Sequence, residues 1–193
     1  LQIVALTRAP MTGPDADADR RVLADAVEAG ADVVGGCPHL GPGATDSVAH
    51  AFEVAARAGL PVDLHTDETL DPSMLTVLDM ADHVRSAGFD HGVAASHCVS
   101  LGMQSPADQH RIAGQIADAG IAVLPQPQTN LYLQGRGHPT ATPRGLTALR
   151  ALREAGVVVA AGADNVQDPY NLVGRFDPLE TAALLVMAGH VPP

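Results

Sequence analysis

The sequence has 193 residues, of which 46% are hydrophobic and 17% are charged. This composition is typical of one globular domain with a sizeable core and excludes a disordered chain. The net charge of −11 argues against nucleic acid or an anionic membrane as a partner, and no apolar run approaches a membrane span of roughly 18 residues. Because Cys37 and Cys98 are the only cysteines, a disulfide framework is not expected and a cytoplasmic location is the default.

At five places along the chain an Ala-Gly pair follows an amphipathic segment and precedes an apolar run; these pairs end in Gly30, Gly59, Gly88, Gly120 and Gly156. Glycine suits the left-handed position that follows a helix, so each pair marks a helix end. The capping pairs Ser105-Pro106 and Asp71-Pro72 indicate where two helices begin. The pattern predicts helices alternating with strands near residues 1–6, 31–36, 60–65, 92–97, 121–125 and 157–163.

Alternating strands and helices predict an α/β fold with a parallel sheet, either doubly wound or closed as a (β/α)₈ barrel. In a doubly wound sheet the functional groups concentrate at one switch point, whereas a TIM barrel collects them from most strand ends. Polar side chains follow nearly every predicted strand here, which favours the barrel with six of its eight βα units present. These side chains are Arg8, His39, His65, Glu68, His97, Gln126, Gln128, Asp164 and Asn165.

Three residues at different strand ends, His65, His97 and Asp164, are expected to converge on the barrel axis. Imidazole nitrogen and carboxylate oxygen are ligands of catalytic zinc and non-haem iron. Glu68 lies in the loop above, where a carboxylate could move protons to and from an activated water. The alternative for any one of these histidines is a hydrogen-bonded position at the edge of the core. Asp67 is expected to make a structural hydrogen bond.

Two further residues have less specific interpretations. His39 in "PHLGP" either lines the pocket or is a solvated turn histidine. Cys98 directly follows His97, and strand alternation turns it away from that histidine, so we expect it to pack in the core.

Four runs of the sequence resemble the bacterial cytosine deaminase branch of the amidohydrolase superfamily, in the same order and at similar spacings. They are "VDLHTDE", "ASHCVSL", "NLYLQGR" and "GADNVQDPYN". The resemblance covers essentially the whole chain and implies strands 3–8 of the barrel, so residues 1–193 would be a single partial barrel domain. The family's first-strand His-X-His pair has no counterpart here. We therefore expect the first two strands and a flanking small β domain to lie outside this chain, and the chain alone to be inactive.

The resemblance also implies roles for four residues. His65 and Asp164 would be ligands of one divalent metal ion, zinc or iron, and Asp164 would also act as a base toward the metal-bound water. Glu68 would protonate the ring nitrogen beside the carbon under attack. His97 would lie beside the metal and hold the hydroxide or the tetrahedral oxygen.

Two positions depart from the cytosine deaminase pattern. Arg8 stands where that family has a glutamine that reads the pyrimidine, and Asn165 replaces a second aspartate. Both are expected to bind substrate, and together they favour an oxo-rich ring or a substrate with a carboxylate over cytosine, because arginine offers only hydrogen-bond donors. The alternative for Arg8 is a loop salt bridge with a nearby aspartate.

The function predicted from the sequence is hydrolytic deamination of a small nitrogen heterocycle. One alternative is an N-substituted triazine amidohydrolase of the ammelide type, which shares the barrel and differs in the leaving group. The other is a non-catalytic barrel fragment that binds a ligand or a partner. Whether the protein forms a homo-oligomer is left open by the sequence.

Overall fold

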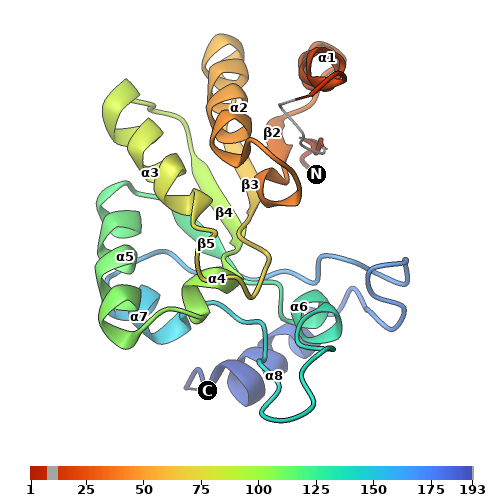
Figure 1. Ribbon diagram of the computed structural model, residues 1–193. Helices are drawn as coiled ribbons and strands as arrows, with labels where there is room; N and C mark the ends of the chain where they lie inside the picture. The colour runs from red at the N-terminus through yellow and green to blue at the C-terminus, as the bar shows by residue number, and fades with distance from the viewer. Residues whose placement is uncertain (8–12, 193) are drawn as a thin grey trace.

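The computed structural model describes residues 1–7 and 13–192, which alternate short strands with helices (Figure 1). The strands are β1 (Val4–Ala5), β2 (Val33–Gly36), β3 (Val62–Thr66), β4 (Val93–His97) and β5 (Ala122–Leu124). The helices are α1 (Ala16–Glu28), the 3₁₀ turn η1 (Pro38–Leu40), α2 (Ala44–Ala58), α3 (Thr76–Ala87), α4 (Val99–Gly102), α5 (Pro106–Asp118), α6 (Pro127–Leu133), α7 (Leu149–Glu154) and α8 (Pro178–Gly189).

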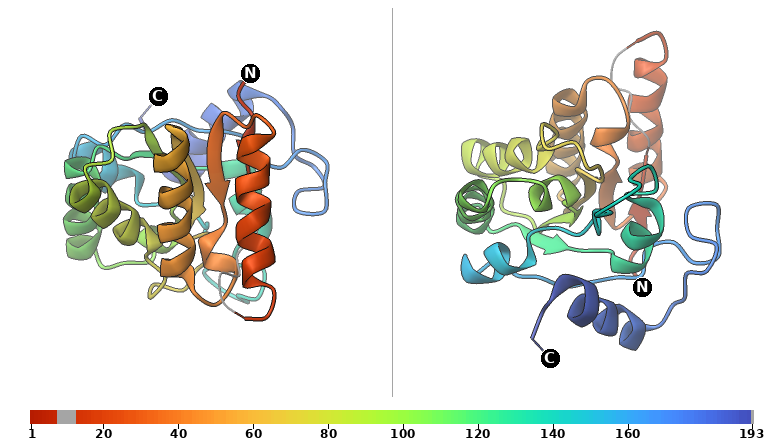
Figure 2. Two further views of the ribbon diagram at one scale, coloured as in Figure 1. Left: turned by 90° about the horizontal axis from the view of Figure 1, so that it is seen from above. Right: turned by 60° about the horizontal axis from the view of Figure 1, so that its bottom comes forward.

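The five strands form one parallel sheet whose spatial order is the chain order, β1-β2-β3-β4-β5. Helices α1, α2, α3, α5 and α7 contact one another in the same succession, and they lie together on one side of the strands (Figures 1 and 2). A doubly wound sheet reverses its strand order and carries helices on both faces. The arrangement is therefore that of an open part of a (β/α)₈ barrel, as predicted.

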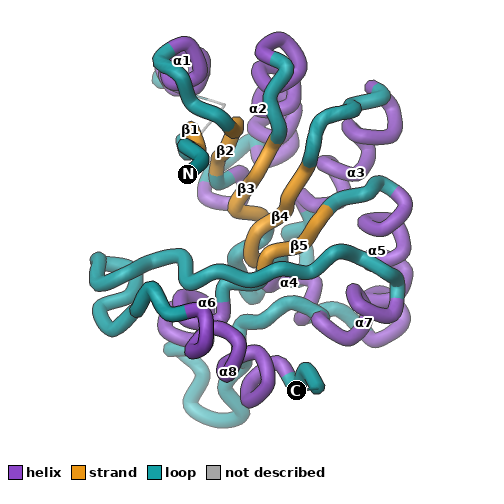
Figure 3. The backbone as a smooth tube through the Cα atoms, turned by 180° about the vertical axis from the view of Figure 1, so that it is seen from behind, coloured by secondary structure: helices purple, strands orange, loops and turns teal. Residues whose placement is uncertain are grey.

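The sixth predicted strand, residues 157–163, is not a regular strand among the described residues, so this part of the prediction is wrong. The segment still runs parallel beside β5 (Figure 3), where Val123 N donates to Val158 O at 2.9 Å and Ala160 N donates to Val123 O at 3.2 Å. The next residue, Pro125, directly follows β5 and has no N–H to donate, although its carbonyl accepts from Gly162 N at 3.3 Å. The ladder is therefore reduced to the single bridge between Val123 and Val159.

The core lies between the sheet and its helices. Along β3, Val62, Leu64 and Thr66 are buried, whereas Asp63 and His65 on the opposite face are only half-buried. The alternation shows that one face of the strand packs on helices and the other faces the barrel interior. The largest fully buried apolar side chains are Leu23, Leu64, Met80, Leu101, Ile112, Ile116, Ile121 and Leu152.

The helix boundaries confirm most of the predicted signals. All five Ala-Gly glycines have positive φ, and Gly59 and Gly88 cap α2 and α3 in the left-handed conformation. Ser105 caps α5 by accepting from Asp108 N, as predicted. The predicted start of α3 at Asp71-Pro72 is wrong, because Asp71 instead closes a turn onto Ser73 and the helix begins at Thr76. No helix in the described part of the chain is long and apolar enough to cross a membrane.

Candidate active site

Two histidines meet where β3 and β4 end. The parallel register pairs His65 with Ser96 and Thr66 with His97, which brings the last residues of both strands to one edge of the sheet. His97 Nε2 lies 3.1 Å from His65 Nδ1, and the ring centroids are 4.8 Å apart. The His97 side chain is fully buried, and the two imidazoles lie together at the carboxyl end of the sheet, as the sequence predicts.

Glu68 lies above this pair in the loop after β3. Its Oε1 is 3.6 Å from His97 Nδ1, and its Oε2 is 3.9 Å from His39 Nε2. Asn130 Nδ2 on α6 donates to Glu68 Oε1 at 3.2 Å. Only 15% of the Glu68 side chain is exposed, so this carboxyl is fixed against the histidines by contacts from three different segments.

Asp164 reaches the same cluster from the segment that follows residues 157–163. Its Oδ2 lies 3.8 Å from His97 Nε2. Thr129 on α6 holds this segment, because its hydroxyl donates to Ala163 O at 3.2 Å and accepts from Asn165 N at 3.1 Å. Asp164 therefore occupies the position predicted for it although the strand before it is irregular.

The backbone is strained at this edge of the sheet. Asp67, His97, Cys98 and Asp164 all have φ between +48° and +67°, a region that costs non-glycine residues free energy. Asp67 offsets part of this cost through its buried carboxylate, which accepts from Thr76 N at 2.7 Å, Thr76 Oγ1 at 2.6 Å and Val77 N at 3.1 Å. Its predicted structural role is confirmed, and it caps α3 from nine residues away. Cys98 is buried as predicted.

Burial controls the charges in the cluster. It raises the pKa of Glu68 to about 7, and the neighbouring Asp164 carboxylate adds to this rise. Burial also raises the pKa of Asp164. Burial, together with the adjacent His65, lowers the pKa of His97 to about 3. Near neutral pH the site therefore holds a neutral imidazole beside a carboxyl that can both donate and accept a proton.

The donor set suits a divalent transition metal. His65, Glu68 and His97 each offer one ligand atom, and these atoms all lie within 4.8 Å of one another. Asp164 adds a carboxylate 3.8 Å from His97. Imidazole and carboxylate together are typical ligands of zinc and non-haem iron. The cluster thus fits the metal that the resemblance implies, and the geometry alone allows Glu68 to be a ligand as well as a proton carrier.

Two further residues join the cluster; the sequence singled out His39 but not Asn130. His39 in η1 has a side chain only 4% exposed, so the solvated alternative is wrong; its Nδ1 lies 3.0 Å from His65 O. Asn130 lies in the run "NLYLQGR", and its Nδ2 is 3.0 Å from His97 Nδ1. Their positions depend on contacts with distant segments, and a one-dimensional pattern does not show such contacts.

Besides His97, two further residues are predicted to bind substrate, and they have different outcomes. Arg8 lies outside the described residues. Asn165 lies next to Asp164, but its side-chain amide donates to Asp168 Oδ2 at 2.7 Å. Within the described residues, the Asn165 amide thus has a partner in its own loop.

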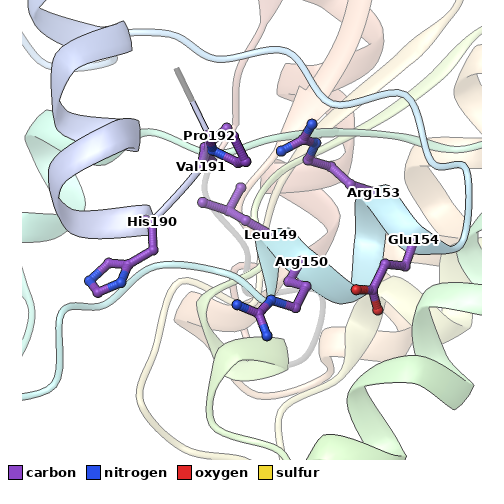
Figure 4. Close-up of a pocket in the computed structure, with 8 residues that line it drawn as sticks. Leu149, Arg150, Arg153, Glu154, His190, Val191 and Pro192 are labelled. Atoms are coloured by element: carbon purple, nitrogen blue, oxygen red, sulfur yellow. The ribbon is translucent and has the colours of Figure 1, made fainter.

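A surface pocket of about 440 Å³ lies elsewhere, between α7 and the end of α8 (Figure 4). It is lined by Leu149, Arg150, Arg153, Glu154, Gly189, His190, Val191 and Pro192. None of His39, His65 and His97 lines this pocket. We therefore place the chemistry at the carboxyl ends of β3 and β4.

Comparison with known proteins shows similarity to deaminases and to a related hydrolase. The chain is 37% identical over 182 residues to the pterin deaminase of Rhizobium rhizogenes (strain K84 / ATCC BAA-868), covering 93% of this chain and 41% of that protein. The structure of 5-methylcytosine deaminase from Klebsiella pneumoniae liganded with 5-fluorocytosine superposes with a TM-score of 0.88 and 31% identity, over 98% of this chain and 46% of that one. The structure of N-isopropylammelide isopropylaminohydrolase from Burkholderia multivorans ATCC 17616 superposes with a TM-score of 0.76 and 28% identity, over 100% of this chain and 46% of that one.

The chain therefore spans less than half the length of each of these relatives. The sequence model of the Amidohydrolase family matches residues 5–192, which is nearly all of it. The chain belongs to the Amidohydrolase family.

Proposed function

We propose that the protein containing this chain removes an amino group from a small nitrogen heterocycle by hydrolysis. The observation that carries the proposal is the convergence of His65, Glu68, His97 and Asp164 at one edge of a parallel sheet. Two relatives named as deaminases, one of pterin and one of 5-methylcytosine, support the same reaction class.

His65 and Asp164 are the proposed ligands of a divalent metal ion, zinc or iron. The ion, when bound, activates the attacking water. A catalytic metal generally has three or more protein ligands, so we expect further ligands from outside these 193 residues. We therefore treat the chain as one part of a larger barrel. In agreement with this, the chain covers 41% of the pterin deaminase and 46% of the 5-methylcytosine deaminase.

Glu68 is the proposed proton carrier, and His97 the proposed hydrogen-bond donor to the oxygen that develops negative charge. The position of Glu68 over the cluster and its raised pKa, about 7, support its role. His97 is buried and uncharged near neutral pH, which suits a fixed donor better than a general base.

The substrate is proposed to be an oxo-substituted amino heterocycle of the pterin or pyrimidine class, recognised in part by Arg8 and Asn165. Similarity to a pterin deaminase over 93% of the chain supports a ring larger or richer in oxygen than cytosine. Arginine offers only donors and matches carbonyl or carboxylate oxygens.

A second candidate is hydrolysis of an N-substituted ammelide, with release of an alkylamine in place of ammonia. The likeness to N-isopropylammelide isopropylaminohydrolase, at a TM-score of 0.76, favours keeping it. A non-catalytic protein that only binds such a ring is the third.

One assay separates the three candidates. The protein at its natural length, loaded with zinc or with iron, is incubated with pterin, cytosine, 5-methylcytosine, adenine and N-isopropylammelide, and ammonia and isopropylamine are quantified. Ammonia from a pterin or pyrimidine supports the proposal, and isopropylamine supports the second candidate. If calorimetry shows that a ring binds but neither ammonia nor isopropylamine is released, the result supports the third candidate, a non-catalytic binding protein. An Arg8→Gln variant should shift turnover toward cytosine.

A further inference from the structure

Asn130 joins the two residues to which the chemistry is assigned. Its Nδ2 lies 3.2 Å from Glu68 Oε1 and 3.0 Å from His97 Nδ1. The side chain is fully buried, and it reaches Glu68 from 62 positions away in the sequence. Its Oδ1 has no hydrogen-bond partner among the described residues. A buried amide oxygen without a partner needs an explanation, and the two contacts of the Asn130 nitrogen offer one.

The orientation of this amide follows from its neighbours. When Glu68 is ionised, its carboxylate only accepts hydrogen bonds, so the group of Asn130 that faces it has to be the NH₂. The opposite orientation would place Oδ1 against the carboxylate oxygen at a hydrogen-bonding distance with no proton between them. The same nitrogen then faces His97 Nδ1 and donates to it. A ring nitrogen that accepts a hydrogen bond carries no proton.

We propose that Asn130 is a positioning residue that fixes His97 in the tautomer with its proton on Nε2. A neutral imidazole has one N–H, and the tautomer is set by the partner of the other nitrogen. With Nδ1 occupied by Asn130, the His97 N–H points toward His65 Nδ1 at 3.1 Å and Asp164 Oδ2 at 3.8 Å. His97 can then donate into the space between these two residues and cannot remove a proton from it.

Without Asn130 the other tautomer should prevail. The nearest remaining partner of His97 Nδ1 is Glu68 Oε1, at 3.6 Å. An acceptor there favours a proton on Nδ1, which would leave Nε2 as an acceptor toward His65 and Asp164. The direction of hydrogen bonding across the site would reverse. The catalytic consequence of this inference rests on the proposed function, but the tautomer itself does not.

The tautomer is measured by nitrogen-15 NMR on the histidine-labelled protein at its natural length in mildly alkaline buffer, without metal or substrate. Two-bond proton–nitrogen correlations distinguish protonated from unprotonated ring nitrogens, and His97→Gln identifies the signals of His97. The native chain should show the proton on Nε2. A proton mainly on Nδ1 in the native chain would overturn the inference, whatever any activity assay gives.

The variant Asn130→Ala should move the larger share of the His97 population to the Nδ1-protonated form. Gln134→Ala is the matched control, because Gln134 ends the same helix and donates to Glu68 O at 3.2 Å without contacting His97. It should keep the native tautomer. If Asn130→Ala fails to fold, as seen by loss of amide dispersion, Asn130→Asp replaces it, and its carboxylate should also place the proton on Nδ1. An unchanged tautomer in a folded Asn130 variant would reduce Asn130 to a structural residue.

Discussion

The region built on β2, β3 and β4 differs from the region after residue 156 in how firmly it holds its part of the site. His65 and His97 end paired strands whose other face packs on buried side chains such as Leu64 and Met80. Asp164 follows a segment bridged to β5 at one residue pair. Close to it, Phe176 is 90% exposed and Leu179 is 79% exposed. One half of the site therefore has a rigid scaffold, whereas the other is set on a surface whose apolar side chains are uncovered.

The two regions hold their site residues by different kinds of contact. The strained conformations of Asp67, His97 and Cys98 are held by dense packing and by the hydrogen bonds of Asp67. Backbone strain persists only where the surroundings fix it. Asp164 has a strained backbone too, but its support comes mainly from Thr129. We infer that the packed region sets the geometry of Glu68 and the histidines, and that Asp164 is the more adaptable member.

The largest expected effect is in the packed region and concerns turnover. Glu68→Gln keeps the shape and the hydrogen bond from Asn130 but cannot exchange a proton. Turnover by the protein at its natural length should fall by about a hundredfold to ten-thousandfold, the usual contribution of a general acid–base group. Glu53→Gln is the control, because Glu53 is an exposed acid paired with Arg57 on α2, and steady-state kinetics should show it unchanged. Near-native turnover by Glu68→Gln would rule out Glu68 as the proton carrier.

A pair of phenylalanines tests the packing difference directly. Phe52 is 4% exposed and packs against His83 and Phe89 with ring centroids 5.3 and 5.0 Å away. Phe52→Ala should lower the free energy of unfolding by about 3–5 kcal/mol, as for other buried aromatic truncations. Phe176→Ala should change it by less than about 0.5 kcal/mol, because Phe176 is exposed. Urea unfolding of the 193-residue chain measures both, and equal losses would contradict the division into two regions.

Removing a helix cap in each region should change the stability by less, and the two losses again compare the regions. Ser105 caps α5 in the packed region, and Asp177 caps α8 in the other by accepting from Leu179 N at 2.9 Å. Ser105→Ala should cost about 1 kcal/mol of global stability, the typical value of a cap. Asp177→Ala should cost less, because α8 buries little of its surface and its fraying need not unfold the sheet. A larger loss for Asp177→Ala in the same urea titrations would show that α8 is part of the cooperative unit.

The smallest effect concerns an exposed contact between α5 and α7. His110 Nε2 lies 2.8 Å from Glu154 Oε2, and its Nδ1 is 2.7 Å from Pro106 O. The contact with Pro106 O, followed by that with Glu154, raises the pKa of His110 above its usual 6.5. A raised folded-state pKa gives stability that is complete below 6.5 and disappears as pH rises through the folded value.

Thermal unfolding followed from pH 5.5 to about 8.5 should therefore show a slight loss of stability that Glu154→Gln reduces, since exposed pairs contribute little. A slope that is the same in both proteins would mean that Glu154 does not act on His110.

The sequence predicted the parts of the site that depend on regular strands. His65 and His97 fall at the ends of two continuous apolar runs, so their convergence follows from the parallel order. The failure at residues 157–163 has a cause that is visible in the sequence, because Pro125 removes a donor from the neighbouring strand. The apolar pattern of residues 157–163 gives no information about the donors of the strand that they pair with.

Other features depend on contacts between distant segments. The start of α3 is set by Asp67, nine residues before Thr76, and not by the local pair at Asp71. Asn130 contacts Glu68 across 62 residues. His39 is buried because His65 at the end of β3 and Glu68 in the loop after it both contact it. Local signals place residues on elements, but which side chains then touch is decided by the packing of the whole sheet.

We propose that His65 holds the metal while Glu68 moves the proton, although both lie in one compact group of possible ligands. The most direct test is the metal content per polypeptide of the protein at its natural length, measured by plasma mass spectrometry after exhaustive dialysis. Glu68→Gln should retain the native content, and His65→Ala should lose most of it. Metal loss in Glu68→Gln equal to that in His65→Ala, or full metal in His65→Ala, would contradict the assignment.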